Sequence, residues 1–140
     1  MEAIQISMSA LDVEWQRLQI IAQNLANMNT TRMADGNIFQ PLRLVSGPDI
    51  NFDALMTGER TPEDPAGVHV LGVEAVQNSS RTVFDPNHPH ADENGVVTYP
   101  NVDHAAEMTL MIKTSRVYEA NLTVMSLAEQ MYRSALEAGR

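Results

Sequence analysis

The residue types best suited to chemistry in this sequence gather in one short polar stretch, Asp85–Gly95. It holds two histidines and three carboxylates within eleven residues. Imidazole nitrogens and carboxylate oxygens are ligands for divalent metals, and His88, His90, Asp92 and Glu93 are the candidates here. A metal-binding or regulatory module that uses this loop is therefore one hypothesis for the function.

The same stretch also fits a purely structural loop. Pro89 separates the two histidines and fixes their relative directions. The spacing matches neither C-x-x-C nor H-E-x-x-H, and the EF-hand pattern lacks its glycine. Carboxylates in proline-stiffened loops commonly cap turns. We favour this interpretation and predict no metal and no cofactor.

Catalytic patterns are absent from the rest of the sequence. It contains no G-x-S-x-G element and no glycine-rich phosphate loop, and His104 stands at an expected helix start without an evident catalytic partner. There are no cysteines, which excludes disulfides and thiolate ligands. Trp15 and the tyrosines lie in apolar patterns and are expected to pack rather than bind a cofactor. We predict that the protein is not an enzyme.

Composition limits the class of partner. The 140 residues carry a net charge of −9 with no Lys/Arg cluster, so nucleic acid and anionic membrane are poor partners. The first residues lack a basic region and a continuous apolar run, and no transmembrane run follows, so neither a cleavable signal peptide nor membrane insertion is expected. Nine methionines against three phenylalanines indicate deformable apolar surfaces.

An amphipathic helix is predicted at the N-terminus. Its apolar residues alternate in steps of four and three, the spacing of a coiled-coil stripe. The stripe consists of Ile4, Met8, Leu11, Trp15, Leu18, Ala22 and Leu25. It stops at Asn27–Thr31, where the residues favour caps and turns. Burying its six large side chains gives at most about 10–20 kcal/mol, whereas ordering about 25 residues costs about 1–2 kcal/mol each, so we expect the helix to form only when docked.

A longer helix is predicted over Asp103–Ala138, with Asp103 as N-cap and Gly139 after its end. It carries two apolar stripes. The first comprises Met108, Met111, Tyr118, Leu122, Met125, Tyr132 and Leu136, and the second Leu110, Val117, Val124, Ala128, Met131, Ala135 and Ala138. One partner helix cannot cover both.

Length supports the same point. A helix over this range is about 54 Å long, whereas a compact chain of this size is about 35 to 40 Å across. We therefore expect it to protrude and to offer apolar surface to other molecules. A central core helix is the alternative.

Between the helices we predict a small β-rich insert with long loops. The expected strands are Ile38–Val45 at an edge because of Pro41, Val68–Val76 with a bulge at Gly72, Arg81–Phe84 and Val96–Tyr99. Asn78 and Ser79 are expected to turn the second strand into the third, and Ser46–Gly67 and Asp85–Gly95 to be loops. The predicted class is α+β, with the terminal helices forming an antiparallel coiled-coil-like pair. The expected parts are residues 1–31 and 101–140 for the helical core and 32–100 for the insert.

Several stretches resemble a known family. Gln23–Thr31, at the end of the first helix, resembles the signature shared by bacterial flagellar rod, hook and related axial proteins. The loop Asp85–Asp92, the strand Gly95–Val102 and the following helix, with the ending Ala135–Arg140, are similar to rod members of that family. These stretches cover both ends and about half of the chain. The departures lie in the insert, at Phe39–Val45 and Thr57–Pro65.

The resemblance implies a structural subunit of the flagellar basal-body rod. It implies export by the flagellar type III apparatus without a cleavable signal, and location in the periplasmic rod. Implied partners are other rod subunits, the adaptor protein at the rod base and further copies of this chain. A helical adaptor or chaperone remains an alternative. The predicted assembly interface comprises Ile4, Met8, Leu11, Trp15, Leu18, Leu25, Asn27, Asn29, Met108, Met111, Val117, Tyr118, Leu122, Val124, Met125, Met131, Tyr132 and Leu136.

Overall fold

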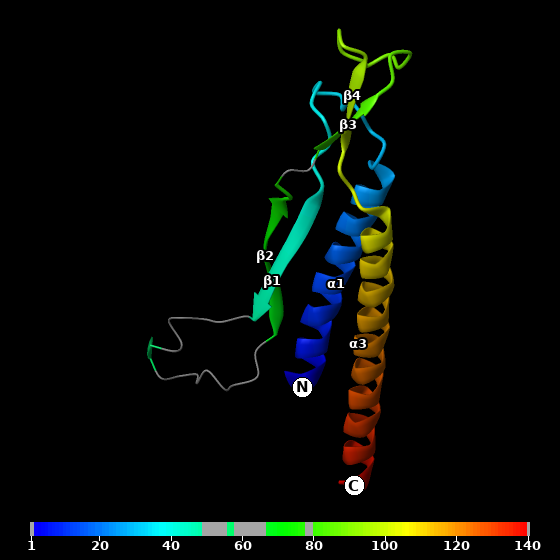
Figure 1. The fold of residues 1–140 in the computed structure, drawn as a ribbon. Helices are drawn as coiled ribbons and strands as arrows, with labels where there is room; N and C mark the ends of the chain where they lie inside the picture. Colours follow the sequence, from blue (N-terminus) through cyan, green and yellow to red (C-terminus); the bar gives the residue numbers. More distant parts are fainter. Residues whose placement is uncertain (1, 49–55, 58–66, 78–79, 140) are drawn as a thin grey trace.

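Two long antiparallel helices form the body of the molecule (Figure 1). A computed structural model describes residues 2–48, 56, 57, 67–77 and 80–139. In chain order its elements are α1 (Glu2–Ala26), β1 (Leu42–Pro48), β2 (Val68–Ala75), β3 (Ser80–Phe84), β4 (Val96–Pro100) and α3 (His104–Ala138). The predicted α+β class, with terminal helices around a small antiparallel β insert, is confirmed.

Helix α1 packs between α3 on one side and the β1–β2 hairpin on the other (Figure 1). Side chains of α1 hold the hairpin by hydrogen bonds to strand atoms. Near the end of α1, Asn24 bonds both backbone groups of Leu42, at 2.9 Å each. Near its start, the Ser9 hydroxyl accepts from the backbone N–H of Val68 at 3.0 Å. The hairpin is therefore tied to α1 at both ends.

The strand pairing differs from the predicted one. We expected β2 to turn back into β3, but β2 pairs with β1, and β3 pairs with β4 (Figure 1). The expected turn residues Asn78 and Ser79 lie outside the described residues. Asp85–Gly95 connects β3 to β4 and closes the second hairpin, and the backbone N–H of Asp85 donates to the Gly95 carbonyl at 2.9 Å. The prediction was wrong because it paired neighbours along the chain, whereas the partner of β2 precedes a long connection.

The first strand is also displaced from its predicted range. It begins at Leu42, after Pro41, and extends to Pro48, so Ser46–Pro48 belong to a strand and not to the predicted loop. Proline has no N–H to give to a ladder, which places Pro41 outside the strand, although its carbonyl accepts from Val76. Both strands of this two-stranded sheet are edges, as predicted for the first.

The predicted bulge is present beside Gly72. Val45 pairs with Gly72 but the next residue, Ser46, pairs with Val70, so β2 has one extra residue at Leu71. The rest of the predicted loop, residues 49–67, lies almost wholly outside the described residues.

Helix α3 starts and stops where the sequence predicts. The Asp103 carboxylate accepts from the backbone N–H groups of Ala105 and Ala106, at 3.0 and 3.1 Å. Such a cap satisfies donors that the first turn leaves unpaired. At the other end the N–H of Gly139 bonds the Ala135 carbonyl. Within the described residues, neither helix has the length and apolar content needed to cross a membrane.

Gly95 closes the β3–β4 connection in a left-handed conformation, with φ of 74°. A Cβ there would lie 3.0 Å from the Pro86 Cβ and 3.1 Å from a ring carbon of Phe84. Gly95→Ala is therefore expected to destabilise the hairpin by about 1–3 kcal/mol. Because the hairpin can open locally, the measurement is amide hydrogen exchange at Asp85 and Val96.

The matched control for this substitution is Gly36→Ala. Gly36 has a φ of 85° but nothing within 4 Å of the added Cβ, so only backbone strain is introduced. Equal acceleration of exchange beside both substituted sites would show that the crowding at Gly95 is unimportant.

Candidate assembly surfaces

The side of α3 that packs on α1 follows one helical stripe. Its buried or half-buried residues recur in steps of four and three and are Glu107, Met111, Thr114, Tyr118, Asn121, Met125 and Ala128. The rings of Tyr118 and Trp15 face each other here with centroids 6.4 Å apart. Three members belong to the first predicted stripe of α3. Glu107, Thr114 and Asn121 were missed because the apolar pattern ignores polar residues.

The predicted stripe of α1 is divided between covered and open positions. Ile4, Leu11, Leu18 and Leu25 are half-buried, at heptad spacing. Met8 and Trp15 instead stay 52% and 54% exposed. The residues of α1 that are most buried lie on the side between α3 and the hairpin and include Val13, Glu14, Ile21 and Asn24. The coiled-coil stripe thus faces α3 with one edge and solvent with the other.

This open edge continues across both helices. On α1, Asp12 lies one helical turn from Met8 and from Trp15. On α3, Tyr118 faces Trp15, and the exposed Glu119 and Leu122 follow it along the helix. We call this the flank surface; it consists of Met8, Asp12, Trp15, Tyr118, Glu119 and Leu122. It is mostly apolar, and its charged members are acidic.

A second apolar surface lies on α3 about a quarter-turn away from its contact with α1. Its large side chains are open: Val117 is 38% exposed, Val124 51%, Leu127 53% and Met131 74%. Lys113 and Arg116 stand at its upper end. We call this the outer surface; it consists of Lys113, Arg116, Val117, Val124, Leu127 and Met131. It contains Val117, Val124 and Met131 of the second predicted stripe of α3.

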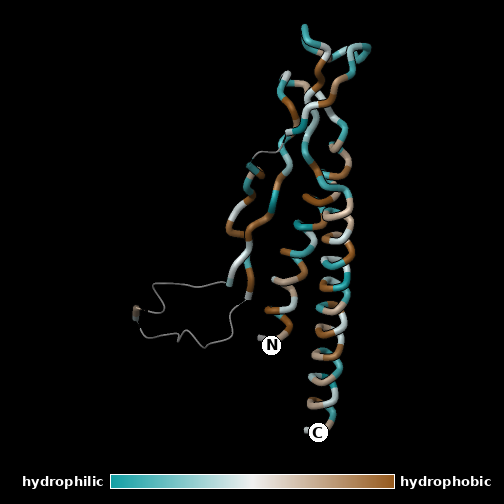
Figure 2. Tube along the Cα trace, in the orientation of Figure 1, coloured by the Kyte–Doolittle hydropathy of each residue, from teal (hydrophilic) through white to brown (hydrophobic). Residues whose placement is uncertain are grey.

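The last turns of α3 extend beyond α1 (Figure 2 shows hydrophobic residues continuing there). From Glu129 to Gly139 every residue is exposed. Tyr132 and Leu136 continue the stripe that faces α1 in the earlier turns of α3, yet they are 50% and 57% exposed because α3 extends past the start of α1. The helix therefore protrudes, as its length predicted.

A small cavity with a mostly apolar lining lies toward the other end of the helix pair. About 170 Å³ in volume, it is bounded by α1, β1 and the first turns of α3, with Arg17, Ile21, Leu44 and Glu107 in its wall. The guanidinium of Arg17 pairs with Glu14 at 2.9 Å and donates to the Ser46 hydroxyl at 2.8 Å. The bond to Ser46 holds α1 to the strand.

The histidine-containing loop makes structural contacts. The Nδ1 of His88 accepts from the backbone N–H of His90 at 3.1 Å, and the Nδ1 of His90 bonds the Thr31 hydroxyl at 2.7 Å. The His88 ring also stacks edge-on against Tyr99, with centroids 6.1 Å apart. Within the described part of the chain, no group of three or more metal-ligating side chains comes together.

The carboxylates of the same loop cap turns, as predicted. One oxygen of Asp92 accepts from the N–H groups of Asn94 and Val96, at 2.9 and 2.8 Å, and Asp85 accepts from Asn87. The loop is thereby closed on itself, and the bond between Thr31 and His90 links it to the segment after α1.

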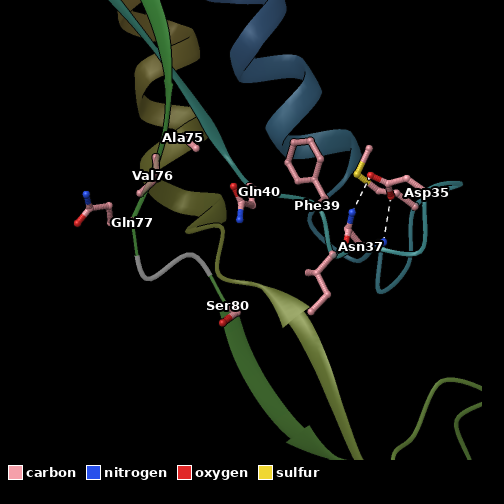
Figure 3. Close-up of a pocket in the computed structure, with 10 residues that line it drawn as sticks. Asp35, Asn37, Phe39, Gln40, Ala75, Val76, Gln77 and Ser80 are labelled. Atoms are coloured by element: carbon pink, nitrogen blue, oxygen red, sulfur yellow. Dashed lines mark hydrogen bonds between the residues drawn. The ribbon is translucent and has the colours of Figure 1, made fainter.

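An open cleft of about 850 Å³, not anticipated from the sequence, lies between the segment before β1 and the segment joining β2 to β3 (Figure 3). Its walls include Phe39, Gln40, Gln77 and Ser80. At its rim, the backbone and side-chain N–H groups of Asn37 both donate to Asp35 at 3.0 Å, which lowers the pKa of that carboxyl. These bonds make Asp35 the carboxylate of a turn.

Comparison with known proteins matches both ends of the chain to flagellar rod families. Residues 4–32 match the family described as "Flagella basal body rod protein". Residues 93–138 match "Flagellar basal body rod FlgEFG protein C-terminal". These two segments contain α1 and α3, the helices that carry the flank and outer surfaces.

Curated relatives match over nearly the whole length. "Flagellar basal-body rod protein FlgC" of Borreliella burgdorferi is 33% identical, over 96% of this chain and 93% of that protein. The protein of the same name from Bacillus subtilis is 33% identical, over 99% and 97%. The one from Salmonella typhimurium is 34% identical, over 96% and 94%. With two terminal helices of the rod type and this similarity across the β insert, the chain belongs to the FlgC family of flagellar basal-body rod proteins.

Proposed function

We propose that this chain polymerises with other rod subunits through its terminal helices, using the flank and outer surfaces. Membership of the family makes it a structural subunit of the flagellar basal-body rod. We assign assembly to residues 1–31 and 101–140, and a lateral lobe to residues 32–100. The proposed role is that of a non-enzymatic building block of the periplasmic drive shaft, exported by the type III apparatus without a cleavable signal.

The observation that carries this proposal is the open outer surface of α3. Three of its side chains, Val124, Leu127 and Met131, are at least half exposed and follow one another along the helix. Contiguous exposed apolar side chains mark interaction sites on proteins. Burying each on assembly stabilises the contact by about 1.5–3 kcal/mol. The flank surface supplies a second, different contact, and an open helical assembly needs two unlike surfaces.

The partners proposed are other rod subunits, further copies of this chain and the adaptor protein at the rod base. The alternative metal-binding role has no support in the loop, where the Nδ1 atoms of both His88 and His90 are engaged in hydrogen bonds. A self-contained helical adaptor or chaperone fits poorly with a helix that is exposed from Glu129 to Gly139.

The test places charge on the outer surface. Val124→Asp with Met131→Asp is expected to abolish incorporation into basal bodies and swimming, because two carboxylates cannot be buried unpaired in the contact. Both side chains are exposed in the monomer, so its thermal stability should change little. Incorporation is measured by immunoblotting of purified basal bodies, and swimming in soft agar.

Thr123→Asp with Gln130→Asp is the matched control. It introduces the same charges at the same spacing, one residue earlier, on the side of α3 that points away from α1. Normal swimming by the Val124 and Met131 variant would refute the proposed use of the outer surface. Equal loss by both variants would show only that α3 tolerates no added negative charge.

A further inference from the structure

Charge is segregated around the exposed sides of α3. Two of its cations, Lys113 and Arg116, lie at the outer surface, which contains no acidic residue. Its exposed acids Glu119, Glu129 and Glu137 fall on the other side, toward the flank surface. The third cation of α3, Arg133, lies on that side between Glu129 and Glu137, beyond the flank surface. On a chain of net charge −9, a local surface with cations and no acid is unusual. The outer surface is basic and the flank surface is acidic.

The charges of both surfaces are unpaired within the described part of the chain. The salt bridge found there joins Arg17 and Glu14, on a buried side of α1. Lys113 and Arg116 have no carboxylate within salt-bridge distance, and neither Asp12 nor Glu119 has a cation within that distance. Two sets of opposite charge are thus free to pair between molecules.

A groove sits at the basic end of the outer surface. About 350 Å³ in volume, it is lined by Thr109, Ile112, Lys113, Arg116 and Val117. Ile112 is 53% exposed and Val117 38%, so the groove offers apolar wall between two cations. On the flank surface the arrangement is inverted, with Asp12 standing between the large apolar side chains of Met8 and Trp15.

We propose that the outer surface of one copy of this chain binds the flank surface of a second copy. In the complex Met8 and Trp15 of the second copy lie against the groove and Val117, and Asp12 lies between Lys113 and Arg116. The contact is heterologous, since each copy keeps a free flank surface and a free outer surface, so it repeats without closing. This inference rests on the proposed function and names the partner of its assembly surfaces.

Electrostatic complementarity supports the choice of a second copy as occupant. Opposite charges across a contact fix its register and disfavour wrong pairings. If two outer surfaces met, the cations Lys113 and Arg116 of the two copies would repel each other. Contacts of this type weaken with salt, because partly exposed ion pairs are screened.

The test exploits the absence of cysteine from the chain. Two differently tagged full-length copies are expressed together, one with Asp12→Cys and the other with Lys113→Cys, and purified basal bodies are treated with diamide. A disulfide requires Cα atoms within about 7 Å, so a dimer carrying both tags is expected. Glu74→Cys, on exposed β2, replaces Asp12→Cys as control and should give none.

A charge exchange tests the chemistry in the same cross-linking strains. Lys113 carries the cysteine there, so reversal is made with Arg116→Glu, which should lower the dual-tag yield on the order of tenfold. Two further substitutions in the partner copy, Glu119→Lys and Gln16→Lys, place cations on its flank surface, the second one helical turn from position 12. They should restore the dual-tag yield. Arg32→Glu, an exposed reversal away from both surfaces, is the control.

The outcomes separate this inference from the function on which it rests. Absence of the dual-tag dimer, when both cysteine variants enter basal bodies at normal levels, would overturn the copy-to-copy contact and leave the rod role intact. Failure of the tagged unsubstituted chain to enter basal bodies at all would instead count against the proposed function.

Discussion

Removing Tyr132–Arg140 is expected to abolish assembly and swimming while leaving the folded monomer almost as stable as the intact chain. The reason is that these residues are largely open to solvent: Tyr132 is 50% and Leu136 57% exposed, because α3 extends past the start of α1 (Figure 1). Burying two such side chains on assembly contributes about 3–6 kcal/mol per contact. Losing it weakens association by at least a hundredfold.

The truncated protein is compared with the full chain in two measurements. Urea unfolding of the purified monomer should differ by less than about 1 kcal/mol, whereas basal bodies should contain no truncated subunit. Ser134→Ala with Glu137→Gln alters the same segment without shortening it or removing its large apolar side chains, and should behave like the unsubstituted chain. A swimming strain that carries the truncation would contradict the assembly role of this segment.

The helices were predictable because their signals are local. The four-three spacing, the Asp103 cap and Gly139 define α1 and α3 without reference to the rest of the chain. Strand pairing is not local in this way. Val68–Ala75 has the pattern of a strand whichever strand it joins, so its pairing with Leu42–Pro48 across a long connection was not evident from the pattern.

The assembly surfaces were only partly predictable for a related reason. Apolar spacing indicates which residues avoid water, but it does not indicate which molecule covers them. Glu107 and Thr114 are buried against α1, while Met131, with a stronger apolar signal, is 74% exposed. The two stripes of α3 exceed what α1 covers, and their division between α1 and solvent depends on the docking angle of the helices.

Charge segregation around α3 could in principle have been found from the sequence. Lys113 and Arg116 occur within one turn, and Glu119 follows one turn after Arg116, about 60° around the helix toward the flank surface. The pattern acquires meaning only once the side facing α1 is known, because that side sets which charges are open to a partner.

Replacing Asn24 by alanine is expected to destabilise the monomer by about 2–4 kcal/mol, the largest single-residue effect on folding in this chain that we foresee. Asn24 is 1% exposed, and its amide both donates to the Leu42 carbonyl and accepts from the Leu42 N–H, each at 2.9 Å. Alanine leaves both backbone groups without this partner, at about 1–3 kcal/mol for each one that stays buried. A domain of this kind has only about 5–15 kcal/mol to lose.

Urea unfolding followed by circular dichroism measures the effect. Asn27→Ala is the control: its side chain donates to the Gln23 carbonyl at 2.9 Å, where the bond is exposed, and accepts from the Thr30 hydroxyl at 3.2 Å. Water can replace these partners at this half-buried position, so a loss below about 1 kcal/mol is expected. Both asparagines belong to the stretch Gln23–Thr31 that resembles the axial proteins. Equal loss for the two would mean that the bond to Leu42 does not hold β1 to α1. A selective loss at Asn24 would instead place the stabilising role of that stretch in fastening the β insert to the helix pair.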